Sequence, residues 1–437
     1  MRLMHTRDAG FDTDLDALLT LDGAEDETVV SIVTQILADV RTRGDAAVLE
    51  HTRRLDRVVC TELEDLRFDP AECEQAYRSL DSALRDALDH AVVRIRDFHQ
   101  RQRQEGWTFE DEYGNKLGQR VTPLKRVGVY VPGGQASYPS SVLMTVIPAQ
   151  VAGVRDIVVT MPTPDGIKNP SLMAAFHVAG VTQAYAIGGA QAIGALAYGT
   201  QSLSCVHKIV GPGGAFVAAA KRQVFGRVGI DIIAGPSEVL IIADGTTPVD
   251  WVVLDLFSQA EHDPVAQAIL VSPDESFVQA VQTRIEQMID AQPRVDIIRA
   301  SLERRGALIV TRDLTEAIAV SNRVAPEHLE LAVVDPEALM EGIEHAGAIF
   351  MGAYSAEVLG DYAAGPSHVL PTYGTARFSS PLGVYDFQKR SSVLQINGGG
   401  VDQLSMTSAL LARSEGLEAH AQAALARIRK AHDSAAD

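Results

Sequence analysis

Several side chains that could bind a metal ion are crowded into the stretch LFSQAEHDP, residues 256–264. Gln259, Glu261, His262 and Asp263 follow the apolar run VVLDLF within five positions. Gln259 and His262 are three residues apart, so on a helix they share one face. They could provide two metal ligands, or they could simply form a solvated helix end. Two ligands are too few for catalytic zinc, which normally takes three from the protein.

Further candidate ligands lie in two later segments. LGDYAAGPSHVLPT offers Asp361 and His368, and EGLEAHAQAA offers Glu415 and His420. Neither segment contains a sharp zinc motif such as HExxH. A histidine at the end of an apolar helix is also commonly structural or exposed. From the residues alone, these side chains could form a metal site, or they could be ordinary structural or exposed residues.

Candidates for acid–base chemistry stand in RVAPEHLEL, where Glu327 and His328 follow Pro326. A residue before proline tends to leave the helix, so the pair is expected at a helix end or turn. A carboxylate and an imidazole there could share proton transfers, or they could be an ordinary exposed pair. Cys205 begins an expected strand with no His or Asn motif beside it, so we interpret it as a buried structural cysteine and expect no thiol nucleophile.

Three glycine-rich turns follow expected strands: VYVPGG, IGGAQ and VGPGG. None contains the GxGxxG fingerprint of dinucleotide-binding proteins. Their backbone N–H groups could still hold phosphate at a helix N-terminus, or the turns could be plain strand–helix connections.

The elements that would position these residues alternate between strands and helices. Short apolar strands and helices alternate from 126 to 226 and again from 238 to 352, with a boundary near 235–245. This order predicts two parallel sheets covered by helices. Residues 25–105 show a helical pattern, 353–400 are rich in Gly, Pro, Ser and Tyr and predict a long loop region, and 402–432 predict a helical tail.

The composition excludes some classes of protein. The chain has 437 residues and a formal charge of −19, which argues against nucleic acid as a partner. Its three cysteines show no metal-binding or disulfide spacing, which fits a reducing compartment. The N-terminus has no apolar signal segment and no stretch is apolar and long enough to span a bilayer. We therefore expect a cytoplasmic protein.

Taken together, these stretches resemble the L-histidinol dehydrogenase family from about residue 120 to 424. The matching runs are RVGVYVPGG, GGAQAIGALAYGT, KIVGPG, AKRQVFG, IDIIAGPSEVLIIAD, DLFSQAEHDP, RVAPEHLEL, GPSHVLPTYGTARFSSPLGVYDFQKRSS and EGLEAHAQAA. They occur in the expected order, and several are long and specific. The resemblance implies a zinc-dependent homodimer that oxidises L-histidinol through L-histidinaldehyde to L-histidine, with two NAD and water, in the last steps of histidine biosynthesis.

The resemblance also implies a fold and its boundaries. We predict an α/β fold with two incomplete Rossmann-like parallel-sheet domains, N-terminal helices and a C-terminal helical tail. The expected parts are a segment of dimer contacts at 1–24, a first α/β domain with the N-terminal helices at 25–129 and 239–381, a second Rossmann-like domain at 130–238, and a tail at 382–437 that reaches the partner subunit.

Carried onto this sequence, the resemblance assigns roles to individual residues. The expected zinc ligands are Gln259, His262, Asp361 and His420. Glu327 and His328 are the expected catalytic pair, with His328 as general base and Glu327 activating water. Besides the zinc ligands and His328, Ser237 and Glu415 are expected to bind substrate. Tyr130, Gln191 and Gly214 mark the expected NAD contacts, and Glu415 and His420 are expected to complete the partner's site.

One position departs from the family pattern. The family usually has Asn after GPG as a contact to NAD, and this chain has Gly214. We therefore hypothesise a raised KM for NAD. The alternatives are a dehydrogenase of another small diol with the same fold, a zinc hydrolase in which Glu327 activates water, and a binding protein that has lost catalysis.

Overall fold

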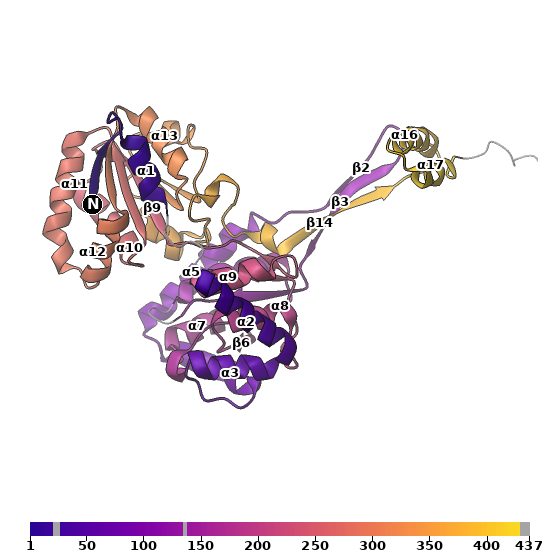
Figure 1. Ribbon diagram of the computed structural model, residues 1–437, viewed down its shortest axis with the longest axis horizontal. Helices are drawn as coiled ribbons and strands as arrows, with labels where there is room; N and C mark the ends of the chain where they lie inside the picture. The colour runs from indigo at the N-terminus through magenta and orange to yellow at the C-terminus, as the bar shows by residue number, and fades with distance from the viewer. Residues whose placement is uncertain (21–26, 134–137, 429–437) are drawn as a thin grey trace, which may run out of the picture. The chain divides into compact units, whose positions relative to one another are not determined.

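The computed structural model describes residues 1–20, 27–133 and 138–428 of the chain. These residues form two compact units (Figure 1). The first contains residues 1–102 and 124–387, and the second contains residues 103–123 and the chain from 388 onward. Parts of the predicted N-terminal segment and helical region (21–26), of the second α/β domain with the turn VYVPGG (134–137) and of the tail (429–437) lie outside the described residues.

A six-stranded parallel sheet forms one half of the first unit, in the order β1-β11-β10-β9-β12-β13. Its strands are β1 (Arg2–His5), β9 (Glu238–Ala243), β10 (Gln267–Ser272), β11 (Ala307–Val310), β12 (His328–Ala332) and β13 (Ala348–Met351). The central strands are apolar runs because helices cover both faces of the sheet. Along β9, Val239 and Ile241 pack into one core, and Leu240 and Ile242 pack into the other.

The helices of this half divide between these two cores. One core contains buried residues of α10 (Val249–Ala260), α11 (Glu275–Met288) and α12 (Val295–Arg305). The other contains buried residues of α1 (Phe11–Leu19), α13 (Leu314–Val324) and α14 (Pro336–Met340). Since each helix runs back along the sheet after its strand, the end of α10 lies near the amino ends of the strands.

A five-stranded parallel sheet forms the other half, in the order β6-β5-β4-β7-β8. Its strands are β4 (Arg126–Tyr130), β5 (Asp156–Thr160), β6 (Gln183–Tyr185), β7 (Lys208–Val210) and β8 (Gly229–Ile230), connected by α6 (Pro139–Ala152), α7 (Pro170–Val178), α8 (Gly189–Tyr198) and α9 (Ala215–Val224). The strand order reverses between β4 and β7. At such a switch point, open α/β sheets bind ligands outside the carboxyl ends of their strands. The predicted α/β class and both parallel sheets are thereby confirmed.

Four N-terminal helices belong to the half with the five-stranded sheet. They are α2 (Glu27–Arg43), α3 (Asp45–Leu55), α4 (Pro70–Ser79) and α5 (Ser82–Gln100). Their buried residues, such as Val40 and Ile95, share one core with that sheet and its helices. The boundaries expected from the sequence grouped these helices with residues 239–381. An apolar helix face shows that a helix is packed, but it does not show which sheet it covers.

The second unit contains a sheet that the sequence analysis did not anticipate. β14 (Gln388–Gln395), β3 (Lys116–Pro123) and β2 (Trp107–Glu110) pair antiparallel in this order. The helices α16 (Val401–Ser414) and α17 (Glu418–Leu425) follow β14 and form the helical tail. Part of the long loop expected at 353–400 is therefore strand. Among the described residues, no helix combines the length and the apolar character needed to cross a membrane.

Candidate active site

His328 lies at the centre of a buried group of acidic side chains, at the amino ends of β9 and β12. It begins β12 opposite Val239 of β9, and only 4% of its surface is exposed. Its Nδ1 lies 3.0 Å from the carbonyl oxygen of Glu238, to which a protonated Nδ1 donates. Within the described part of the chain, Nε2 has no hydrogen-bond partner, and it lies 3.5 Å from Oδ1 of Asp361. The backbone thus fixes one ring nitrogen and leaves the other for a ligand or a proton.

Carboxylates surround the imidazole of His328. Glu327 and Glu357 lie 3.7 and 3.9 Å from Nδ1. Burial alone would lower the pKa of His328, but the charges of Glu357, Glu327 and Asp361 raise this pKa well above its ordinary value. Burial also raises the pKa of Glu327 and of Glu357 to about 8, and the charge of His328 partly offsets both shifts. The group holds more buried acid than one imidazole can balance, so a cation would stabilise it.

Helix α10 supplies a polar stripe to this group. Gln259 is fully buried, and with its amide nitrogen facing Glu357 it donates to both carboxylate oxygens, at 3.1 and 3.2 Å. The backbone N–H of Glu357, the first residue of α15 (Glu357–Leu359), donates to Oε1 of Glu330 at 2.8 Å. Glu330 in turn shares a hydrogen bond with Asp255 of α10. This orientation of Gln259 turns its amide oxygen away from Glu357, where it is available to a ligand.

Asp361 joins the group from a π-helical turn, Gly360–Ala364. π-Turns occur frequently at functional sites. Burial opposes ionisation, but the neighbouring imidazole of His328, together with His368 and His262, lowers the pKa of Asp361. His368 approaches the carbonyl oxygen of Asp361 with Nδ1 at 3.1 Å and Oγ of Ser141 with Nε2 at 3.2 Å. Ser141 lies in the first turn of α6, so this contact connects the two halves of the unit.

Possible metal ligands can be compared with those expected from the sequence. In the described residues, His328, Glu357 and Asp361 offer ligand atoms that lie within 4.8 Å of one another. This group shares Asp361 with the expected ligand set and touches the expected ligand Gln259. Nδ1 of His262 turns back to the carbonyl oxygen of Gln259 at 3.3 Å, which leaves its Nε2 for another partner. Nitrogen and oxygen donors of this kind suit a borderline divalent cation such as zinc.

Four acidic residues of this region were missed by the sequence analysis: Glu357, Glu330, Glu238 and Asp255. Glu238 and Glu330 are charged residues on strands in which every residue is buried, a signal that was present in EVLIIA and HLELA. Burial raises the pKa of Glu238 to about 7, partly offset by Arg305. Asp255 precedes Gln259 by one helical turn, so a search for a polar stripe on α10 would have found it.

A second group of expected residues lies at the carboxyl ends of the five-stranded sheet. The hydroxyl of Tyr130, at the end of β4, accepts a hydrogen bond from the N–H of Gly189 at 3.2 Å, and burial raises its pKa to about 12. Gln191 in the first turn of α8 is buried, and neither of its amide atoms has a partner among the described residues. Gly214 is the N-cap of α9. A buried amide without partners is costly unless a ligand satisfies it.

The remaining three expected residues are Ser237, Glu415 and His420. Ser237 directly precedes Glu238, the first residue of β9. Its carbonyl oxygen accepts a hydrogen bond from the N–H of Gln267 at 2.9 Å. Glu415 and His420 are exposed and belong to the second unit, where Glu415 is the C-cap of α16 and His420 lies on α17. They are therefore not part of the compact unit that holds His328.

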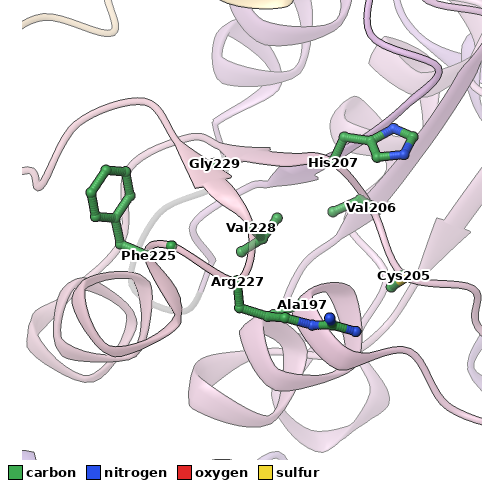
Figure 2. A pocket seen from close by; sticks show the side chains of 9 residues that line it. Ala197, Cys205, Val206, His207, Phe225, Arg227, Val228 and Gly229 are labelled. Atoms are coloured by element: carbon green, nitrogen blue, oxygen red, sulfur yellow. The ribbon is translucent and has the colours of Figure 1, made fainter. Parts of the chain in front are cut away.

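The interpretation of Cys205 was wrong. The residue is exposed and precedes β7 in a loop, because this loop runs over the surface at the amino end of the strand. It lines a surface pocket of about 460 Å³ together with Val206, His207 and residues 225–229 (Figure 2). This pocket lies at the amino ends of β7 and β8, and none of the expected site residues lines it.

The fold and the two groups of residues define an α/β enzyme with a buried imidazole–carboxylate centre and a separate glycine-rich turn site. Comparison with known proteins identifies its family. Residues 21–428 match the family model described as histidinol dehydrogenase. The chain therefore belongs to the histidinol dehydrogenase family.

Individual relatives agree with this assignment over nearly the whole chain. A histidinol dehydrogenase of Bordetella parapertussis is 56% identical over 425 residues, covering 97% of both chains. One of Dechloromonas aromatica is 53% identical over 428 residues, covering 98% of this chain and 99% of that protein. The crystal structure of histidinol dehydrogenase from Elizabethkingia anophelis superposes with a TM-score of 0.91 at 33% identity, covering 98% of each chain.

Proposed function

We propose that the chain oxidises L-histidinol to L-histidine in two successive steps, through L-histidinaldehyde, with two NAD and water. The chain is an oxidoreductase of the histidinol dehydrogenase family, and its relatives match over nearly its full length. The observation that carries the proposal is the buried Nε2 of His328, which has no partner among the described residues and lies in a ring of carboxylates. Such a base can remove the proton of an alcohol.

The test of this proposal is a count of products. Purified, zinc-loaded protein is given L-histidinol and excess NAD, and NADH and L-histidine are quantified at completion. Two NADH and one L-histidine per L-histidinol support the four-electron reaction. One NADH with accumulation of the aldehyde, or no NADH at all, contradicts it. Formation of NADH also separates a dehydrogenase from the alternative of a zinc hydrolase, which forms none.

Gln259, His262, Asp361 and His420 are the proposed zinc ligands. The acid-rich surroundings of the first three fit a cation, and the orientation of Gln259 leaves its amide oxygen available. When bound, zinc would hold the imidazole and amine of histidinol and so orient its carbinol carbon toward the nicotinamide. Because a neutral amide is a weak ligand, we expect chelators to remove the metal and Mn²⁺ to replace it in part.

The catalytic pair has distinct roles. The carbonyl oxygen of Glu238 holds Nδ1 of His328, so Nε2 is the atom that takes the substrate proton. Glu327 accepts a hydrogen bond from the backbone N–H of Glu238 at 2.9 Å, which fixes its carboxyl beside the ring. We assign Glu327 to the activation of water in the second oxidation. Its pKa of about 8 makes it a stronger base, when ionised, than an exposed carboxylate.

Tyr130 and Gln191 are the proposed NAD contacts, at the carboxyl ends of the five-stranded sheet. The unpartnered amide of Gln191 and the hydroxyl of Tyr130 both lie by Gly189, at the start of α8. Helix N-termini and glycine-rich turns bind phosphate through backbone N–H groups. Gly214 offers only such backbone groups, and we propose that NAD binds more weakly for this reason.

We also propose a homodimer with shared active sites. The second unit exposes many large apolar side chains, a pattern typical of protein interfaces: Trp107, Phe109, Leu394, Met406, Leu410 and Leu411. In this arrangement the exposed His420 and Glu415 complete the site of the partner subunit.

Mixing two inactive variants tests the sharing of sites. His328→Ala and His420→Ala are each purified, mixed, dissociated and reassembled. If the sites are shared, half of the dimers are mixed and each restores one site, so activity recovers to about a quarter of wild type. No recovery, with mixed dimers demonstrated by tagged copies, would contradict shared sites.

A further inference from the structure

A buried ion pair holds the glycine-rich turn between β7 and α9. Lys221 of α9 is 1% exposed, and the side chains of Lys221 and Asp231 are each 2% exposed where they pair. Asp231 directly follows β8, so the pair lies inside the β7–α9–β8 crossover. Within the described residues, neither side chain makes a hydrogen bond or an ion pair with the catalytic pair or with the expected metal ligands.

The pair holds both backbone groups of Gly211, the first residue of the turn GPGG. Nζ of Lys221 donates to the carbonyl oxygen of Gly211 at 2.9 Å and also to Oδ1 of Asp231. Oδ2 of Asp231 accepts from the N–H of Gly211 at 2.7 Å. Gly211 has a φ of +107°, a conformation that other residues rarely adopt. The pair therefore fixes an unusual backbone conformation at the point where the chain leaves β7.

Stability alone does not account for this pair. Removing two charges from water costs free energy, and well-packed apolar residues of similar size often replace a buried pair at no loss of stability. Apolar residues could hold α9 on the sheet, but they could not bind the N–H and carbonyl of Gly211. What the pair contributes beyond packing is the position of the turn.

The turn has one packed side and one open side. A Cβ added at Gly211 would lie 2.0 Å from the carbonyl oxygen of Tyr130, and one at Gly213 would lie 3.1 Å from Cε1 of Tyr130. By contrast, a Cβ added at Gly214 would meet no heavy atom of the described residues within 4 Å. The end of the turn at Gly211 thus packs on the proposed NAD contact Tyr130, and the end at Gly214, the N-cap of α9, is not packed against any other described residue.

We propose that Lys221 and Asp231 are positioning residues for the dinucleotide, which hold the turn of Gly211–Gly214 and Tyr130 in the geometry that binds NAD. This inference rests on the proposed NAD contacts at the five-stranded sheet. With Asn absent at position 214, the turn relies on its backbone groups, and these bind a phosphate well only if they are already in place.

The test compares three variants by steady-state kinetics in both substrates. Lys221→Met removes the donor to Gly211, and the double variant Lys221→Met, Asp231→Asn does so without leaving a buried charge. Lys208→Met is the matched control, because Lys208 begins the same strand and donates to Asp386 rather than to the turn. Its Nζ lies 2.9 Å from both the carbonyl oxygen and Oδ1 of Asp386. All variants are first compared with wild type by thermal unfolding.

We expect both Lys221 variants to raise KM for NAD about tenfold, the effect of losing hydrogen bonds to buried groups, with KM for L-histidinol changed by less than about twofold. Lys208→Met should leave KM for NAD near wild type. The inference is overturned if the folded double variant keeps the wild-type KM for NAD, or if Lys208→Met raises it equally. Tyr130→Phe and Gln191→Ala, measured in parallel, show separately whether the cofactor contacts themselves are correctly assigned.

Discussion

The two parallel sheets of the first unit carry their candidate functional groups at opposite ends. In the five-stranded sheet, Tyr130 and the turn of Gly211–Gly214 follow the carboxyl ends of strands, as is usual for open α/β sheets. In the six-stranded sheet, His328 and Glu238 stand at the amino ends. Gln259 reaches the same end because α10 runs back along the sheet after β9.

The carboxyl and amino ends of parallel strands offer different chemical groups to a ligand. The carboxyl ends offer backbone N–H groups at helix N-termini, which suit an anionic dinucleotide. The amino ends lack these groups, and the chain places buried side chains there instead. The result is one site made largely from backbone and one made from titratable side chains whose pKa values are strongly shifted. Perturbations of one site should therefore leave the other nearly intact.

Metal removal should have the largest effect and should act on one site only. We expect EDTA to abolish nearly all activity and Zn²⁺ to restore it, with Mn²⁺ restoring part. NADH binding, measured by fluorescence, should change by less than about twofold because its site is separate. Full activity of a protein shown to be metal-free by elemental analysis would refute the metal's role.

Substitution of His328 should have the second-largest effect on activity. In His328→Asn we expect kcat to fall about 10²- to 10⁴-fold, since the general base is lost, with KM for NAD nearly unchanged. His177→Asn is a suitable control, because His177 of α7 lies beside Tyr77 and outside both sites. An equal loss in the control, or a loss confined to KM for NAD, would be evidence against the assignment.

Glu357 is expected to support zinc binding through Gln259 and His328. Glu357→Gln removes a charge that faces Gln259 and His328, and we expect zinc affinity to fall about 10- to 100-fold, as for other groups that orient metal ligands. Competition with a chromogenic chelator measures this affinity. Glu344→Gln, at an exposed site, is the control. Unchanged zinc affinity in Glu357→Gln would show that Glu357 does not support the metal.

The pH dependence of activity should reflect the raised pKa values of His328 and Glu327. The pKa values of His328 and Glu327 are raised, and both must lose a proton to act as bases, so activity is lost as pH falls. We expect kcat/KM for L-histidinol to rise at least tenfold per pH unit on the acid side and to level off only above about pH 8, with a bound cation moving this limb to lower pH. A flat profile between about pH 6 and 9 would contradict these shifts.

The smallest effect is expected at the turn of the five-stranded sheet. Gly214→Asn places an amide where a Cβ meets no described residue, at the N-cap of α9, a position that Asn favours. One added hydrogen bond should lower KM for NAD about two- to tenfold and leave KM for L-histidinol unchanged. A KM for NAD that stays the same or rises would contradict the hypothesis that Gly214 weakens NAD binding.

The sequence predicted the parallel sheets because their strands are continuous apolar runs between turns. It did not predict β1 or the three-stranded sheet. Arg2–His5 pairs with Ala307–Val310, and Gln388–Gln395 pairs with Lys116–Pro123, and local patterns do not specify pairings over such separations. The largely exposed β2 and β14 also lack the apolar runs that identify buried strands.

For the candidate site, local motifs and resemblance pointed to His328, Glu327, Gln259 and Asp361, which the structure brings into one neighbourhood. The acids around them were not found, since Glu330 and Glu357 belong to segments that looked like ordinary strand and loop. The exposure of Cys205 was missed because an apolar neighbourhood in sequence does not fix the depth of a loop. Whether His420 joins the site depends on a partner subunit, which a single chain does not contain.

The most direct test of the division between the two sheets is a crystal structure with zinc and NAD, recorded with anomalous scattering at the zinc edge. We predict a zinc peak about 2.0–2.2 Å from the nearest donor atoms of Gln259, His262 and Asp361, and NAD at the turn of Gly211–Gly214 beside Tyr130. A zinc peak away from the His328 group, or NAD bound elsewhere than the carboxyl ends of the five-stranded sheet, would contradict the account.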